Sequence, residues 1–143
     1  MLSMTKEETL KLFAQYDDPI NWEYPCGYDY NKEISRFRKF LRTLEQLLGT
    51  KLDSETESYI QDASFHSQIL FKRGALRFSN FGNLVAFTIN HEIDEETVRL
   101  VEHLCDEMNY VLINTDAAKL PYTGVNPGVT DISNWWIRYF GWV

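Results

Sequence analysis

Residues 75–90, ALRFSNFGNLVAFTIN, decide how the rest of the chain is interpreted. Segments 75–80 and 83–90 have the composition of short strands, and turn-forming residues separate them. We therefore predict a hairpin that is joined around Phe81 and Gly82. We expect Gly82 to adopt a positive backbone angle φ in the turn.

The segment before the hairpin has small or apolar residues at every second position: Ala63, Phe65, Ser67, Ile69 and Phe71. Beginning near Ala63, this period of two continues to Phe71, which predicts one half-buried strand. Lys72, Arg73 and Gly74 then provide a turn into the hairpin. We therefore expect three consecutive strands in an antiparallel meander.

A helix and a further strand are predicted after the meander. Asp94 is a suitable N-cap for a helix over residues 95–109, and acidic residues follow it in the first turn. Ile93 and Val98 occupy the two positions of a hydrophobic staple. Residues 110–114, YVLIN, predict a short, fully buried strand.

Two helices are predicted before the meander. Thr5 and Glu8 have the spacing of a capping box, so the first helix begins there and ends near Tyr16. The second runs from an N-cap at Asn31 to a stop at Gly49. Its apolar face is formed by residues at helical spacing: Ile34, Phe37, Phe40, Leu41, Leu44, Leu47 and Leu48.

The opposite face of the second helix carries a basic cluster, formed by Lys32, Arg36, Arg38, Lys39 and Arg42. In an acidic protein such a cluster is typical of a solvated helix face. A site for phosphate or for an acidic partner is the alternative.

The chain closes on an aromatic-rich segment. We predict a short helix there, opened by Ser133, with Trp136, Tyr139, Phe140 and Val143 broadly on one side. Because so large an apolar patch is unusual on the surface of a soluble monomer, we expect it to close the core. A surface for a partner is the alternative.

Together these elements predict one α+β domain over residues 1–143, in the order α-α-β-β-β-α-β-α. We expect a mostly antiparallel sheet of about four strands with helices packed mainly on one face.

The composition limits the classes of function. The net charge of −7 and the pI of about 4.9 argue against nucleic-acid binding, which requires a basic surface. Such a charge permits a basic partner, or it serves solubility alone. No secretion signal or membrane-spanning run is evident, and Cys26 and Cys105 have no metal-binding spacing, so we expect a cytoplasmic protein with reduced thiols.

No motif for catalysis is recognisable, so we expect a binding protein rather than an enzyme. His66, His91 and His103 are interpreted as surface or hydrogen-bonded histidines. His66 has Ser64 and Ser67 nearby, but adjacent strand residues point to opposite faces. Residues 91–96, HEIDEE, lack the spacing of a metal site, and we expect no metal and no cofactor.

The loop between the first two helices is the main candidate for partner contact. Residues 17–31 combine tyrosine, tryptophan and acidic side chains, a mixture common in protein-recognition surfaces. The aromatic content favours a structured loop packed by its own side chains, and contact with a partner is the alternative. The expected contacts are Asp17, Asp18, Trp22, Glu23, Tyr24, Tyr28 and Asp29, with Tyr122 and Asn126 of the 122–126 loop second.

Three stretches occur together: LRFSNFGNLVAFT (76–88), LPYTGVN (120–126) and WWIRYFGWV (135–143). This combination resembles small bacterial immunity proteins of polymorphic-toxin and contact-dependent-inhibition systems. The resemblance implies a cytosolic protein that binds and blocks a cognate toxin domain, and it implies no catalytic residues. Many toxins that attack nucleic acid are basic, and an acidic inhibitor can mimic the charge of the substrate and associate quickly.

Two other functions stay open. One is a small enzyme or ligand-binding domain with a pocket between sheet and helices and His66 or Tyr122 at its mouth. The other is an adaptor in a homo-oligomer, held by exposed aromatic residues. For an immunity protein we expect a monomer or a weak dimer.

Overall fold

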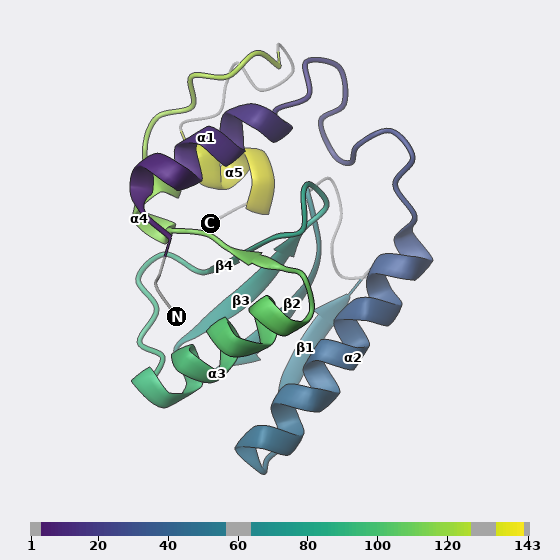
Figure 1. The fold of residues 1–143 in the computed structure, drawn as a ribbon, viewed down its shortest axis with the longest axis vertical. Coiled ribbons are helices and arrows are strands. Elements are labelled where there is room, and N and C mark those ends of the chain that lie inside the picture. Colours follow the sequence, from purple (N-terminus) through teal and green to yellow (C-terminus); the bar gives the residue numbers. More distant parts are fainter. Residues whose placement is uncertain (1–3, 57–63, 127–133, 142–143) are drawn as a thin grey trace.

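The computed structural model describes residues 4–56, 64–126 and 134–141 (Figure 1). A five-stranded sheet with strand order β1-β2-β3-β4-β5 lies at its centre. The α+β class and the order of the predicted elements are confirmed, with two short additional elements, β1 and α4. The elements are α1 (Lys6–Tyr16), α2 (Tyr30–Leu48), β1 (Asp53–Thr56), β2 (Phe65–Phe71), β3 (Gly74–Ser79), β4 (Leu84–Phe87), α3 (Glu95–Glu107), β5 (Val111–Leu112), α4 (Thr115–Ala118) and α5 (Trp135–Phe140).

The central hairpin forms as predicted. β3 and β4 pair antiparallel, and the N–H of Leu84 donates to the carbonyl of Phe81 at 3.0 Å. Gly82 and Asn83 between them both have a φ of 57°, which matches the turn to the twist of the strands. The Tyr16 ring lies 2.5 Å from where a Cβ on Gly82 would be, so both backbone and packing favour glycine.

Strands β1 to β4 form an antiparallel meander, whereas β5 joins β4 in parallel. A parallel neighbour requires a crossover connection, which α3 provides. β1 has no pattern that predicts a strand, because its sequence DSET is polar at every position. β5 is half-buried rather than fully buried, since it has no strand on its outer side in the described part of the chain.

The expectation that helices pack mainly on one face of the sheet is wrong. In β4, Val85 and Phe87 pack in one cluster with α2 and α3, while Leu84 and Ala86 pack in another with α1, α4 and α5. Alternate residues of a strand point to opposite faces, so each cluster covers one face. Figure 1 shows α1, α4 and α5 grouped together, away from α2 and α3.

Because helices cover both faces of the sheet, β2 is not half-buried, contrary to the prediction. Its residues Phe65 to Ile69 are all buried. The polar side chains on the second face are covered by α5 and satisfy one another. The Nε of Arg77 donates to Oε1 of Gln68 at 2.9 Å, and its Nη1 donates to the carbonyl of Phe140 at 2.8 Å. Ala63, where the pattern begins, lies outside the described residues.

Three of the predicted helix ends are confirmed. Thr5 and Glu8 exchange the two hydrogen bonds of a capping box at the start of α1. Asp94 caps α3, and Gly49 ends α2 in the left-handed conformation with a φ of 70°.

Two predicted helix starts are wrong by one or two residues. α2 begins after Asp29 rather than Asn31, and the Asp29 carboxylate accepts the N–H of Lys32. α5 begins after Asn134, whose side chain accepts the N–H of Ile137. Ser133 lies outside the described residues. In both places neighbouring residues can cap equally well, so composition alone does not choose between them.

The aromatic end of the chain belongs to the core, as predicted. Trp135, Trp136, Tyr139 and Phe140 are each at most 3% exposed. They pack with Phe13 of α1, whose carbonyl accepts a hydrogen bond from the Tyr139 hydroxyl. Trp142 and Val143 lie outside the described residues.

Candidate partner-binding surface

A buried ion pair joins the two ends of the chain. The Nε of Arg138 in α5 lies 2.8 Å from Oδ1 of Asp17, which follows α1, and both side chains are at most 1% exposed. The guanidinium lies 4.6 Å from the centroid of the Phe81 ring and 5.0 Å from that of Tyr139. These rings exclude water from the ion pair and favour one orientation of the guanidinium plane. We call Asp17 and Arg138 the hub.

The remaining N–H groups of Arg138 hold the loop that follows α1. Nη1 donates to the carbonyl of Trp22 at 3.0 Å, and Nη2 donates to that of Asn21 at 3.1 Å. Guanidinium is suited to this, since its five donors have a fixed planar arrangement. The backbone of the loop is therefore fixed from the interior.

The second carboxylate oxygen of Asp17 holds the other loop. Oδ2 accepts the Tyr122 hydroxyl and the N–H of Val125, both at 2.7 Å. Gly124 lies against this carboxylate, because a Cβ on it would be 1.9 Å from Oδ2. One side chain thus anchors the 122–126 loop while it pairs with Arg138.

Direct hydrogen bonds join the two loops. The side-chain amide of Asn126 donates to the carbonyl of Asp18 at 2.7 Å and to that of Asn21 at 3.2 Å. The backbone N–H of Asn126 donates to the Tyr122 hydroxyl at 2.9 Å. The segment that carries Val125 therefore lies beside the turn that carries Ile20.

Several residues expected to contact a partner have internal roles instead. Asp17 and Asn126 are buried in the hub and between the loops. The Asp18 carboxylate accepts the N–H groups of Ile20 and Asn21, and these hydrogen bonds lower its pKa. Asp29 caps α2. The acidic character of the loop thus reflects hydrogen bonds that shape its backbone.

The tyrosines of the loop are packed at one end and open at the other. Tyr24 and Tyr28 stack with their centroids 5.6 Å apart. The Tyr28 hydroxyl donates to Asn80 at 3.0 Å, and burial raises the pKa of Tyr28. The Asn80 amide donates in turn to the carbonyl of Glu23 at 2.7 Å. Tyr24 stays 54% exposed.

The two most exposed large apolar side chains of the described residues lie in the two predicted loops, but neither is among the predicted contacts. Ile20 is 84% exposed and Val125 is 64% exposed, and each lies on one of the two joined loops. Together with Tyr24 and the half-buried Trp22, they form what we call the loop surface. The prediction relies on acidic and aromatic residues, which are common at recognition surfaces. A single isoleucine beside Pro19 belongs to no such pattern, so nothing in the sequence singles out Ile20.

The histidines are placed as expected, with one difference. His66 and Ser67 do not point apart, because the strand register shifts between Phe65 and Ser67. The Nδ1 of His66 lies 2.9 Å from the Ser67 hydroxyl oxygen. Both are at most 3% exposed, so a substrate has no access to this pair. His103 lies on the exposed face of α3, next to Glu107.

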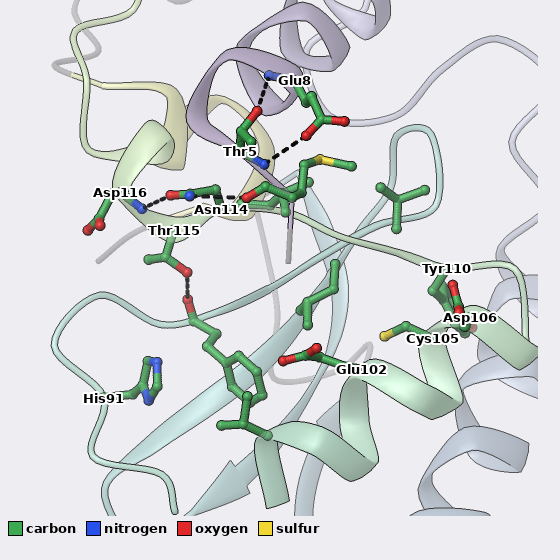
Figure 2. Close-up of a pocket in the computed structure, with 16 residues that line it drawn as sticks. Thr5, Glu8, His91, Glu102, Cys105, Asp106, Tyr110, Asn114, Thr115 and Asp116 are labelled. Carbon is green, nitrogen blue, oxygen red and sulfur yellow. Dashed lines mark hydrogen bonds between the residues drawn. The ribbon is translucent and has the colours of Figure 1, made fainter. Parts of the chain in front are cut away.

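A separate hollow of about 790 Å³ lies between α3, β5 and the start of α1 (Figure 2). Neither His66 nor Tyr122 lines it, so the expected placement of either residue at a pocket mouth is not met there.

Comparisons of the chain with protein-family models, curated proteins and solved structures give no significant match. Within the described ranges no His, Cys, Asp and Glu side chains are grouped so as to hold a metal ion. No helix there combines the length and apolarity needed to cross a bilayer.

Proposed function

We propose that this protein is an inhibitor of the immunity-protein type, which binds a cognate toxin domain through its loop surface and blocks it by contact. The observation that carries the proposal is the exposure of Ile20 and Val125 on two loops that the buried hub holds in place.

The rigidity of these loops supports a binding role. Ordering a flexible loop on association costs free energy, and a loop that is already ordered avoids that cost. Here three backbone carbonyls accept hydrogen bonds from Arg138, and one backbone N–H donates to Asp17. The hydrogen bonds from the fully buried Arg138 therefore hold the loop backbone in place before a partner binds.

The chemistry of the loop surface fits a protein partner. A few side chains in the well-packed centre of an interface, often tryptophan and tyrosine, contribute most of the binding free energy. Ile20, Val125, Trp22 and Tyr24 offer such groups. The net charge of −7 would accelerate association with a basic toxin domain.

The test is to express the protein encoded by the neighbouring gene, with and without this chain. We expect that protein to arrest growth when it is expressed alone. We expect growth to be restored, and a one-to-one complex to be purified, when both are expressed. A neighbour that is harmless alone and forms no complex would reject the proposal.

A further inference from the structure

The hollow beside β5 is a groove along the open edge of the sheet. Its lining residues include the apolar Phe87, Val98, Val111 and Ile113. It lies at the start of α1, whereas the hub lies just beyond the end of that helix. An 11-residue helix is about 16 Å long, so the groove and the loop surface are separate sites.

The backbone of β5 offers unused hydrogen-bonding groups to this groove. The N–H groups of Val111 and Ile113 donate to the carbonyls of Asn83 and Val85, on the β4 side. Leu112 lies between them, so its N–H and carbonyl point to the open side. No hydrogen bond from the described parts of the chain reaches them on that side.

The neighbouring N–H groups on that side are already satisfied. The N–H of Tyr110 donates to the carbonyl of Cys105 at 2.9 Å, and that of Asn114 donates to the Thr9 hydroxyl at 3.0 Å. The open edge is therefore limited to Leu112. One residue of an incoming antiparallel segment can exchange two hydrogen bonds with it.

The charge of the groove is one-sided. Four carboxylates line it, and no lysine or arginine is among its described lining residues. Glu8 is occupied in the capping box, and Asp116 lies 3.3 Å from Lys119. His91 adds no positive charge at neutral pH, because burial lowers its pKa.

Two of the four carboxylates have no partner among the described residues. Glu102 and Asp106 are four residues apart on α3, so they share a face of the helix. Neither forms an ion pair or a hydrogen bond with any described residue. Figure 2 shows Glu102 directed into the open space between α3, the start of α1 and residues 114–116.

We propose that this groove binds an extended, lysine- or arginine-bearing segment of a protein partner. The backbone of that segment pairs with Leu112, and its cationic side chains lie against Glu102 and Asp106. Each feature of the groove matches one part of an extended basic peptide. The apolar lining residues match its apolar side chains, the free backbone groups of Leu112 match its backbone, and the two carboxylates match its cationic side chains. A free cation would use the carboxylates alone.

The probe is an acetylated, amidated octapeptide of alternating Lys and Val, titrated at low salt. We expect the amide signals of Val111, Leu112 and Ile113 to shift in NMR spectra. We expect an octapeptide of alternating Glu and Val to leave them unchanged. A Lys–Val peptide that carries N-methyl groups on the bonding edge should bind much more weakly, because it keeps the charge but loses the hydrogen bonds.

Variants of α3 test the carboxylates. The double variant Glu102→Gln, Asp106→Asn should weaken binding of the Lys–Val peptide about fivefold, as expected for two partly exposed ion pairs. The control is Glu96→Gln, Glu107→Gln, which removes two exposed charges from the same helix outside the groove. It should leave the affinity within about twofold.

Several results would overturn the proposal. They are no binding at millimolar peptide, equal binding of the Glu–Val peptide, equal weakening by both double variants, and binding of spermine as tight as that of the Lys–Val peptide. The variant Ile20→Asp should not change peptide binding. Because no toxin is needed, failure here is distinct from failure of the proposed inhibitory function.

Discussion

Arg138 and Asp17 together form a structural device rather than an exposed charged patch. Removing two charges from water costs several kcal/mol for each ion, and the ion pair compensates only when the remaining donors and acceptors are also satisfied. Here the other N–H groups of Arg138 reach loop carbonyls, and the other oxygen of Asp17 accepts two hydrogen bonds. The pair therefore determines the positions of the loops.

Replacement of Arg138 by methionine should destabilise the protein by about 3–5 kcal/mol, because Asp17 would be left as an uncompensated buried charge. Urea unfolding at pH 7 measures this. Adding Asp17→Leu should recover part of the loss, since no charge is then left buried.

The control for this prediction is Arg99→Met. Arg99 lies 3.6 Å from Glu95 in an exposed pair, with 77% of the arginine side chain exposed. This change should cost less than about 1 kcal/mol. An equal loss in Arg138→Met and Arg99→Met would contradict the role given to the hub.

His66 couples stability to pH. Burial, with a smaller contribution from Arg36, lowers its pKa to about 3, whereas an unfolded histidine titrates near 6.5. The unfolded chain therefore binds a proton below pH 6.5 that the folded chain does not. Stability from this residue is present above pH 6.5 and falls as the pH decreases towards 3.

At pH 4.5 this effect should cost about 2–3 kcal/mol relative to pH 7. Urea unfolding across that range measures it. Carboxylates also titrate in this range, so the comparison is with the variant His66→Gln. The slope of its unfolding free energy against pH should be smaller, by the amount that corresponds to the uptake of about one proton on unfolding. Parallel curves for the two proteins would refute the assignment.

At the scale of elements, α5 is stable only through its contacts. A helix of six residues does not form alone in water. Asn134 caps it, and four aromatic side chains anchor it against α1 and the sheet. The segment is consequently both the last element and the cover of one sheet face.

Deletion of residues 134–143 should unfold the protein or make it aggregate. The loss of four buried aromatic side chains, at about 1.5–3 kcal/mol each, approaches the whole stability of a domain. Thermal melting followed by near-UV circular dichroism measures this. A truncated protein that melts like the full chain would show that these aromatic residues do not form the core.

Elements with local signals were predictable from the sequence. The central hairpin has turn residues whose φ values are confirmed, and α1 and α3 carry their own caps. β1 was not predictable, because DSET pairs with β2 through backbone groups that any sequence has. Helices α1 and α5 were predicted, but their packing on the second face was not, since it depends on which distant segments meet.

The two loops that carry the proposed binding surface could be singled out from the sequence, but the exposure of Ile20 and Val125 could not. The tyrosine-rich loop correctly indicated a segment packed by its own side chains. Three of its four acidic residues, Asp17, Asp18 and Asp29, are internal acceptors. A carboxylate that caps a turn looks the same in sequence as one that faces a partner. Arg138 was missed, since its role depends on Asp17, 121 positions earlier.

At the scale of the whole molecule, the three layers leave the two cysteines in opposite environments. Cys26 is exposed in the loop, whereas Cys105 lies on the buried face of α3. Burial raises the pKa of the Cys105 thiol to about 12. A thiol reagent at pH 8 should therefore modify one cysteine quickly in the folded protein and both in denaturant. Rapid modification of Cys105 in the native state would contradict this packing.

The most direct test of the proposed inhibitory function is the affinity for the protein encoded by the neighbouring gene, measured in two matched variants. Ile20→Asp changes the loop surface, and Leu47→Asp changes a 51% exposed apolar residue on α2. Isothermal titration should show at least a tenfold loss for Ile20→Asp, about 1.4 kcal/mol, and less than a twofold change for Leu47→Asp. Equal affinities for the two variants would mean that the loop surface is not where the partner binds.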